Sequence, residues 1–277
     1  NGRKLLLEQS RDPKDSLSKI VVLLHDLRRG FADTLSYGGN EFKNFAMTDD
    51  GLQVAFVAER DAIPIAIGTK ELEKFYKLWY FKEGMDSAGK LAEKTSVGMQ
   101  VGMTISEYAN LEFSKSGKRL FFGSAPIQAP KDTSLVEIDL VKLDVWHYND
   151  DYLQPQQLKE LQQELKKNYR AVIKPGSTEL VQLGEDGAEN ISLVDEGNAD
   201  WVLATSDKNN RLPAQWEGRS KYTAYMINTK DGRRRLVEAN CPCFFTASPK
   251  GNFISWYNPL LKNYFSYVDI ICFLMEY

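Results

Sequence analysis

The sequence is poor in the residues that hold metals or form redox centres. Its 277 residues include three cysteines and two histidines. Cys241-Pro242-Cys243 has one residue fewer between its cysteines than the usual zinc or redox motif. We therefore expect no metal or cofactor site, and we interpret Cys241 and Cys243 as small apolar residues packed near the start of a strand.

A strong net charge and a long apolar run are also missing. Thirty-five Lys and Arg against 38 Asp and Glu give a net charge of −3, which argues against general binding to nucleic acid or anionic membranes. Arg233-Arg234-Arg235 follows Asp231-Gly232, so we expect a solvated hairpin end. No stretch is apolar enough to cross a bilayer. The N-terminal Asn1-Gly2-Arg3 shows no initiator Met or signal peptide, and we interpret it as the cut end of a longer chain.

What the sequence does contain is a repeated hairpin pattern. The copies are Met47-Thr48-Asp49-Asp50-Gly51, Phe113-Ser114-Lys115-Ser116-Gly117 and Ala247-Ser248-Pro249-Lys250-Gly251. Each follows apolar residues and precedes a short β-rich run, and its glycine can supply the positive φ that such a turn requires. Because a lone hairpin cannot bury its apolar face, the repetition predicts several sheets that pack on one another.

Aromatic strands recur at a similar distance after these turns. Trp79 follows Gly51 at almost the same spacing as Trp146 follows Gly117. Counting back from Tyr225 by the spacing between Gly51 and Trp79 reaches Gly197, which indicates a degenerate fourth copy. The pattern predicts an all-β fold, a β-propeller of four-stranded blades, with a β-sandwich as the alternative.

We expect one propeller-like domain over residues 1–277, a fragment of a longer protein. Its predicted blade units are 41–90, 105–150, 190–238 and 240–277. Lys19 to Leu27 is predicted as an outer strand, so that the chain begins inside a blade. Around 154–168 the apolar residues Leu158, Leu161 and Leu165 recur at helical spacing after Pro155, which predicts a helical insertion.

Several segments resemble the propeller of prolyl-oligopeptidase-family serine peptidases, especially those of Bacteroidetes-type bacteria. The resemblance covers about residues 15–267, and related hairpins occur in periplasmic TolB-type propellers. The segments are Ile105-Ser106-Glu107 through Phe113 to Pro126, Leu143-Asp144-Val145-Trp146-His147-Tyr148-Asn149-Asp150 with Leu153-Gln154-Pro155-Gln156-Gln157, and Ala247 to Gly251. Of these, the Asp-Val-Trp strand followed by the Leu-Gln-Pro-Gln helix is the most discriminating.

The resemblance implies a propeller joined to an α/β-hydrolase domain with a Ser-Asp-His triad, and a periplasmic or exported location. That domain is marked by Gly-x-Ser-x-Gly, which this sequence lacks. Ser36 and Ser124 lie near glycines without this spacing. His25 and His147 both lie in predicted strands, where a packed or solvated strand residue is the interpretation that we prefer to a catalytic base. We therefore assign no catalytic residue.

Two groups of carboxylates are candidates for a ligand site. Asp144, Asp150 and Asp151 cluster around Trp146, whereas Asp49 and Asp50 share a turn. The resemblance implies that such acids could bind a metal or the amino terminus of a peptide. The chemistry of turns and strand ends explains them equally well.

The C-terminal segment, 268–277, is nearly all apolar. Either the chain ends within a blade, or this segment is a strand that closes onto the first. An unclosed array would expose strand edges, which favour oligomerisation.

Two functions follow from these observations. In the first, the chain is the non-catalytic propeller of a prolyl-oligopeptidase-like serine peptidase, and it controls the access of peptide substrates to a hydrolase domain. In the second, it is a free-standing propeller of the TolB or WD type that binds a protein or a glycan. A Gly-x-Ser-x-Gly motif beyond residue 277 of the parent gene would separate them.

Overall fold

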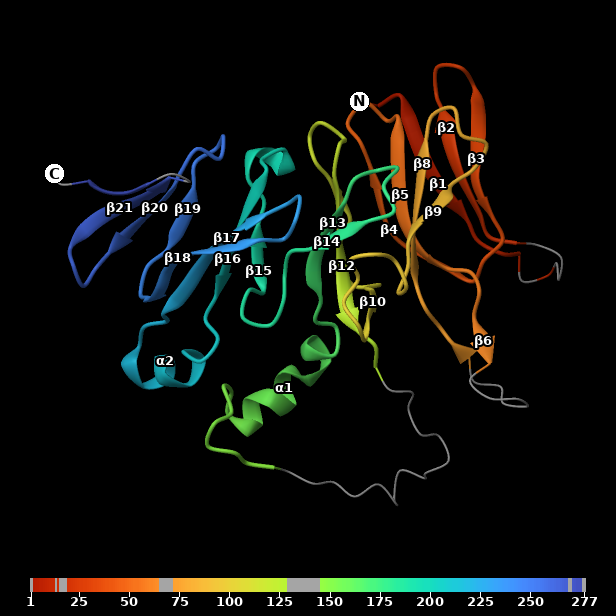
Figure 1. Ribbon diagram of the computed structural model, residues 1–277. Coiled ribbons are helices and arrows are strands. Elements are labelled where there is room, and N and C mark those ends of the chain that lie inside the picture. The colour runs from red at the N-terminus through yellow and green to blue at the C-terminus, as the bar shows by residue number, and fades with distance from the viewer. Residues whose placement is uncertain are drawn as a thin grey trace. The chain divides into compact units, whose positions relative to one another are not determined.

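The described part of the chain forms consecutive antiparallel sheets and two α-helices (Figure 1). The computed structural model describes residues 2–12, 14, 19–64, 72–128, 145–268 and 271–275. The chain divides into two compact units. The first comprises Asn1–Ile127 and Ala171–Gln182, and the second comprises Gln128–Arg170 and Leu183–Tyr277.

Among its described residues, the first unit contains three larger sheets whose strands mostly follow chain order, besides one two-stranded sheet. The first sheet contains β1 (Lys4–Gln9), β2 (Val21–Asp26) and β3 (Phe31–Tyr37). The second contains β4 (Glu41–Met47), β5 (Gln53–Glu59), β8 (Lys77–Lys82) and β9 (Gly89–Ala92). The third contains β10 (Met103–Ile105), β11 (Glu112–Phe113), β12 (Leu120–Pro126), β13 (Tyr169–Ile173) and β14 (Leu180–Gln182). The two-stranded sheet is a short ribbon of β6 (Ile63–Pro64) and β7 (Leu72–Glu73), which lies in the connection between β5 and β8.

The middle sheet of this unit is buried on both faces. Along β5, Val54 and Phe56 pack with β2 and β3, while Ala55 and Val57 pack with β12 and β13. All four side chains have no exposed surface. Because successive strand residues point to opposite faces, an unbroken apolar run in β5 allows it to hold a sheet on either side.

The second unit contains two four-stranded sheets in chain order. They are β15 (Asn190–Ser192), β16 (Trp201–Ser206), β17 (Tyr222–Asn228) and β18 (Arg234–Cys241); and β19 (Phe245–Ala247), β20 (Ile254–Asn258), β21 (Asn263–Val268) and β22 (Ile271–Met275). A cluster that includes Leu203, Met226, Ile254 and Trp256 joins them. Successive antiparallel sheets of this kind, each built from consecutive strands, are the blades of a propeller-type fold. The predicted all-β class with a helical insertion is confirmed.

The repeated turns follow one hydrogen-bond pattern. The amides of Gly51, Gly117 and Gly251 each donate to the carbonyl three residues earlier, at 2.7–2.8 Å. In the degenerate copy the Gly197 amide donates to Val194 O at 3.0 Å, between β15 and β16. In the first three turns the Thr or Ser hydroxyl also accepts a backbone amide at 3.1 Å, which Val194 cannot do. Gly197 therefore lies in a turn with the same backbone hydrogen bond, but Asp195 and Glu196 have positive φ values, unlike the corresponding residues of the other three turns.

The turn glycines also allow neighbouring sheets to approach. Gly251 has φ +70, and a Cβ there would lie 2.9 Å from Val194 Cγ1 in the preceding sheet. Trp201 Nε1 donates to Gly251 O at 2.9 Å across the same contact. In the first unit, a Cβ on Gly117 would lie 2.5 Å from Gln53 Nε2. At Gly251 glycine is thus required both by its φ and by the space, whereas at Gly117 the φ of +66 is the stronger requirement, since the end of the flexible Gln53 side chain can move away.

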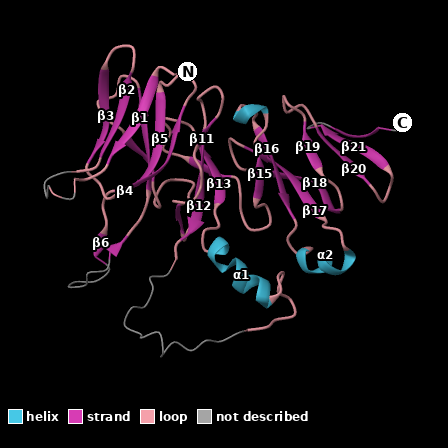
Figure 2. Ribbon diagram, turned by 180° about the vertical axis from the view of Figure 1, so that it is seen from behind, coloured by secondary structure: helices cyan, strands magenta, loops and turns pink. Residues whose placement is uncertain are grey.

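The helices α1 (Gln154–Glu164) and α2 (Arg211–Glu217) belong to the second unit (Figure 2). α1 confirms the predicted insertion, with Pro155 in its first turn. None of its residues is buried, and Leu158, Leu161 and Leu165 are 45–58% exposed. Gln215 on α2 donates to Gln156 on α1 at 3.4 Å, so the two helices are neighbours.

Two strand predictions need correction. Val145 to Tyr148 forms no strand, because the partner that continues this sheet after β12 is β13. Lys19 to Leu27 contains β2, which lies between β1 and β3 and is therefore not an outer strand. The described part of the C-terminal apolar run, β22, pairs with β21 and is the fourth strand of its sheet.

Cys241 and Cys243 are both buried, at 3% and 2% exposure, as expected for packed apolar residues. They are also joined by a disulfide, which the sequence analysis did not predict. Their Cα atoms lie 5.1 Å apart. The single intervening proline places both side chains in the core cluster that contains Trp256.

Candidate functional site

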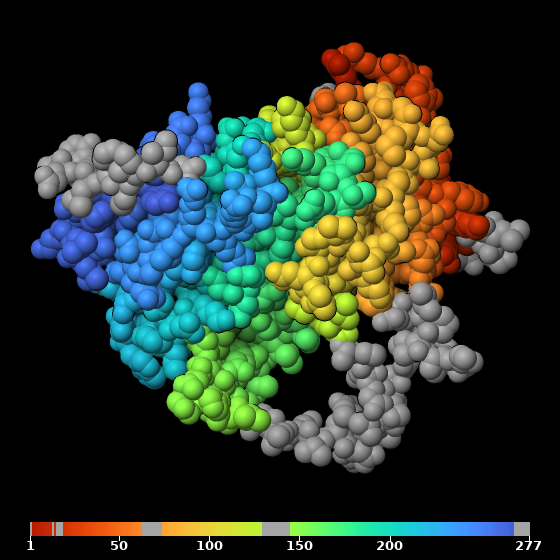
Figure 3. Space-filling model, viewed as in Figure 1, coloured from red at the N-terminus to blue at the C-terminus, as the bar shows by residue number. Residues whose placement is uncertain are grey.

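A pocket of about 260 Å³ lies in the second unit, where the chain approaches α1. It is formed mainly by the loop before the helix, with one residue from α2. The lining residues are Trp146, His147, Tyr148, Asp150, Tyr152, Leu153, Gln154 and Leu212. Figure 3 shows the yellow-green surface of the α1 region next to the cyan surface of the α2 region. A cavity made largely of aromatic and aliphatic side chains with one carboxylate suits a ligand that is partly apolar.

The aromatic side chains of the pocket are presented by an exposed loop. Trp146 and Tyr148 are 66% and 84% exposed. His147 and Tyr148 stack with their ring centroids 4.9 Å apart. The His147 Nδ1 accepts the amide of Asn149 at 3.2 Å, which fixes the orientation of the imidazole. Large aromatic groups exposed together on a folded protein are typical of a binding surface.

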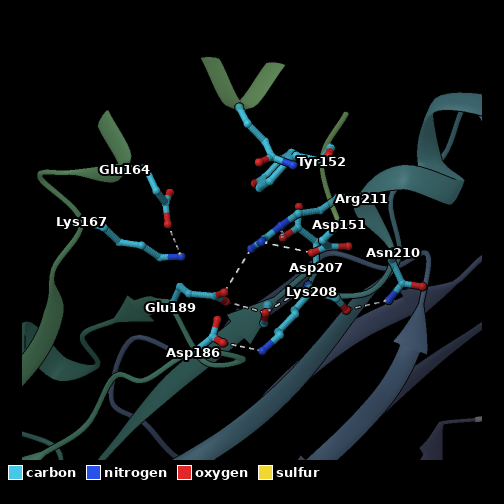
Figure 4. A network of polar contacts seen from close by, with 12 residues as sticks. Asp151, Tyr152, Glu164, Lys167, Asp186, Glu189, Asp207, Lys208, Asn210 and Arg211 are labelled. Carbon is cyan, nitrogen blue, oxygen red and sulfur yellow. Dashed lines mark hydrogen bonds and ion pairs between the residues drawn. The ribbon is translucent and has the colours of Figure 1, made fainter. Parts of the chain in front are cut away.

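Arg211 at the start of α2 holds this loop in place (Figure 4). Its Nε lies 2.7 Å from Asp207 Oδ1, and its Nη2 lies 3.0 Å from Glu189 Oε1. Its Nη1 lies 3.2 Å from Asp151 Oδ2, as an ion pair without aligned hydrogen-bond geometry. The guanidinium carbon also lies 4.9 Å from the ring centre of Tyr152, which lines the pocket. One side chain thereby ties the loop to α2 and to the connection before β15.

The environment of the network favours its charged forms. Burial raises the pKa of Glu189, but the hydrogen bonds from Ser206 and Arg211 outweigh it, so that the pKa is lowered overall. Burial lowers the pKa of Arg211, but the hydrogen bond with Asp207 and the nearby negative charges raise it above its ordinary value. Burial raises the pKa of Tyr152, whose phenol stays protonated. Arg211 and Glu189 are therefore both ionised at neutral pH.

Two further ion pairs border the network in Figure 4. Lys208 pairs with Asp186 at 2.5 Å, and Lys167, which follows α1 in the chain, pairs with Glu164 at the end of that helix at 3.1 Å. The hydrogen bond from Lys208 lowers the pKa of Asp186. Each lysine also attracts Glu189, but because each is paired with its own carboxylate, the two pairs add no net charge to the group around Arg211.

The structure separates the serines and histidines considered in the sequence. His25 lies in β2 opposite Ala32, whereas Ser36 in β3 lies opposite Val22. Three positions along a strand correspond to about 10 Å, so this histidine and serine are not in contact. Ser124 in β12 donates to Gln182 Oε1 at 2.9 Å. His147 lies in the loop of the pocket and not in the strand that we predicted.

The two groups of carboxylates differ in their surroundings. Asp50 accepts the Thr48 hydroxyl and the Leu52 amide, which is turn chemistry, and Asp49 pairs with Lys115 at 2.8 Å. Asp150 lines the pocket and Asp151 binds Arg211, so these two belong to the candidate site. Asp144 lies outside the described residues.

Sequence analysis missed Arg211, Glu189 and Asp207. The spacing of Asp207 and Arg211, four residues apart, is the one signal that was available, since it favours an ion pair near a helix start.

Among the described residues, no three His, Cys, Asp or Glu side chains are arranged to hold a metal ion. No helix in the described part of the chain is long and apolar enough to cross a membrane.

No family model matches the chain, and no curated protein matches its sequence. Similar solved structures include the tricorn protease, at 10% identity with a TM-score of 0.40; the alignment covers 98% of this chain and 24% of that one. TolB from Acinetobacter baumannii matches at 12% identity and a TM-score of 0.36, over 98% of this chain and 51% of TolB. An acylaminoacyl peptidase from Pyrococcus horikoshii matches at 13% identity and 0.43, over 98% of this chain and 37% of the peptidase.

These structural neighbours include both peptidases and TolB, all at low sequence identity. The chain spans at most about half the length of the three structures named above. Because their TM-scores are below 0.5, the assignment of a propeller-type fold rests on the order and pairing of the strands.

Proposed function

We propose that this chain is the non-catalytic propeller portion of a prolyl-oligopeptidase-like serine peptidase, and that it controls which peptides reach a separate hydrolase domain. The observation that carries the proposal is the construction of the sheets. Within each unit, neighbouring antiparallel blades pack on one another, and turns in both units share the glycine motif that the resemblance to this family includes. Such a scaffold admits or excludes ligands by size and holds them by its loops.

The aromatic motif at Trp146 does not form the strand that the sequence predicts. The most discriminating part of the resemblance is the predicted Asp-Val-Trp strand followed by a helix, and Val145 and Trp146 lie in a loop. The following helix, α1, does form. The proposal therefore depends on the repeated turns and on α1, and no longer on an aromatic strand at Trp146.

The proposal is tested first on the reading frame of the parent gene. We expect codons beyond residue 277 to encode Gly-x-Ser-x-Gly followed by Asp and His, the order of an α/β-hydrolase. If that region holds no such motif, the peptidase proposal is wrong. If it does, the full-length enzyme should cleave short peptides and leave folded proteins intact, and cleavage of both with equal efficiency would contradict the gating role.

The isolated chain offers a second test. We expect no turnover of chromogenic peptide substrates by residues 1–277. Turnover that is abolished by a serine-directed inhibitor would show that the chain contains its own nucleophile, and would overturn the non-catalytic assignment.

A free-standing binding propeller is the second candidate, and the pocket lined by Trp146 favours it. Its lining comes entirely from the second unit, so a ligand could bind there without a hydrolase domain. A parent gene without a hydrolase sequence, combined with a ligand that binds this pocket, would establish this function in place of the first.

A further inference from the structure

We propose that the pocket between the α1 loop and α2, defined by its eight lining residues, binds a lysine side chain presented by a peptide or protein. The inference goes beyond the proposed function and does not depend on it, because the pocket is formed within the second unit. It rests on four observations: the aromatic lining, the sign of the surrounding charge, the bonding at the start of α1, and the size of the cavity.

The aromatic lining suits an ammonium group. Trp146, Tyr148 and Tyr152 line the pocket, and the faces of such aromatic rings carry negative potential that attracts cations. The Tyr152 ring already lies 4.9 Å from the Arg211 guanidinium, so this ring interacts with a cation within the protein itself. An ammonium group among these rings would keep such contacts while its aliphatic stem is shielded from water.

The surrounding charge is negative. Asp150 is the only carboxylate among the lining residues, which include no lysine or arginine. Behind the pocket, Arg211 faces the carboxylates of Asp151, Glu189 and Asp207. Together with Asp150, four carboxylates against one guanidinium leave an excess of three negative charges. A cation is therefore favoured over an anion or a neutral group.

The start of α1 does not reverse this preference. A helix N-terminus normally attracts anions through its free amides. Here Pro155 has no amide proton, and the amides of Gln156 and Gln157 both donate to Leu153 O, at 2.9 and 3.0 Å. The Gln157 side chain additionally donates to Asp150 Oδ2 at 3.3 Å. Little donor capacity remains at this helix end for an anionic ligand.

The size of the pocket limits the ligand to one side chain. Its volume of about 260 Å³ is below the range of about 300–1,000 Å³ that is usual for drug-sized ligands. Leu153 and Leu212 supply aliphatic surface for the methylene groups of a lysine. A lysine side chain combines that apolar stem with a terminal cation, and so matches both parts of the lining.

The test uses Nα-acetyl-lysine amide as the probe and Nα-acetyl-norleucine amide as its uncharged analogue. The protein is labelled with 5-fluorotryptophan, and its five tryptophan resonances are followed by NMR, with Trp146→Phe used to assign the relevant one. We expect the lysine amide to shift the Trp146 resonance saturably, with an affinity about tenfold higher than that of the norleucine amide. Added salt should weaken the binding of lysine selectively.

Two substitutions separate the proposed site from general surface charge. Asp150→Asn retains the size of the side chain and should weaken the lysine amide several-fold while leaving the norleucine amide unchanged. The matched control is Asp231→Asn, in the β17–β18 turn, which should change neither. The proposal is overturned if the norleucine amide binds as well as the lysine amide, if Asp150→Asn and Asp231→Asn behave alike, or if the Trp146 resonance does not respond. A circular dichroism spectrum of each variant verifies that it is folded.

Discussion

The middle sheet of the first unit and the pocket loop of the second unit are held in place by opposite means. β5 has no exposed surface from Val54 to Ala58 and packs through apolar side chains on both faces. The loop that contains Trp146 has little buried surface and is tied down by the ion pairs and ring contact of Arg211. The comparison indicates that the scaffold depends on apolar area, whereas the candidate site depends on a few charged contacts whose strength varies with pH and salt.

The largest effect should come from the apolar side of this comparison. Phe56 is fully buried between β5 and the first sheet, and its ring lies 5.6 Å from that of Phe42. Phe56→Ala should lower the free energy of unfolding by about 3–5 kcal/mol, because it leaves a cavity that the sheets cannot close. Chemical denaturation measures the change.

Phe244 is the matched control, since its ring is 84% exposed. Phe244→Ala should change the stability by no more than about 0.5 kcal/mol. Equal losses in the two variants would show that burial between the sheets does not determine stability, and the first half of the comparison would then be wrong.

The second effect concerns the charged side of the comparison. Arg211→Met removes the partner of Asp151, Glu189 and Asp207, and the Arg211 side chain is only 13% exposed. Because three carboxylates lose their counter-charge at once, we expect a loss of about 2–3 kcal/mol. The fluorine resonance of Trp146 should also broaden or shift, because the loop is no longer fixed.

Lys230 provides the control for this substitution. It pairs with Asp200 at 2.5 Å, and both side chains are 54% exposed. Lys230→Met should cost less than about 1 kcal/mol, the usual range for a solvent-exposed ion pair. If it destabilised the protein as much as Arg211→Met, the Arg211 network would have no special role.

A third, smaller effect tests whether the turn glycines are needed for sheet contacts or only for their own φ. Gly251 and Gly218 have similar φ values, +70 and +66, in the same unit. A Cβ on Gly218 would meet nothing within 4 Å, so Gly218→Ala should cost about 1 kcal/mol from backbone strain alone. Gly251→Ala adds a contact of 2.9 Å with Val194 and should cost about 1 kcal/mol more. Equal unfolding free energies for the two variants would contradict close packing between these sheets.

The sequence predicts the parts of the structure that are determined locally. The turn at Thr48 to Gly51 closes through hydrogen bonds among neighbouring residues, so its pattern is visible in a short window. Trp146 shows the limit of such patterns. An aromatic run suits a strand, but a strand also needs a partner, and β12 pairs with β13, which begins only after α1.

The candidate site could be predicted only in part. Asp150, Asp151 and Trp146 are neighbours in sequence, so a short window of the sequence contains all three. Arg211 is distant from Asp151 in the sequence. It reaches this loop because α2 follows β16, which ends beside the start of β15. No local pattern contains that information, since it depends on how the strands are paired.

The smallest predicted effect is a dependence on pH that is confined to the charged region. Since the folded pKa of Glu189 is lowered, its contribution to stability is complete above its unfolded value near 4.5 and is lost as the pH falls through the folded value. Glu189→Gln removes this contribution, so the variant should lose less stability than the wild type between pH 6 and pH 3, by on the order of 1 kcal/mol. Denaturation curves at both pH values measure the difference.

Glu8→Gln, at an exposed position of β1, is the control and should follow the wild type. A Glu189→Gln variant with the pH dependence of the wild type would mean that the carboxylate is not stabilised by Arg211 and Ser206.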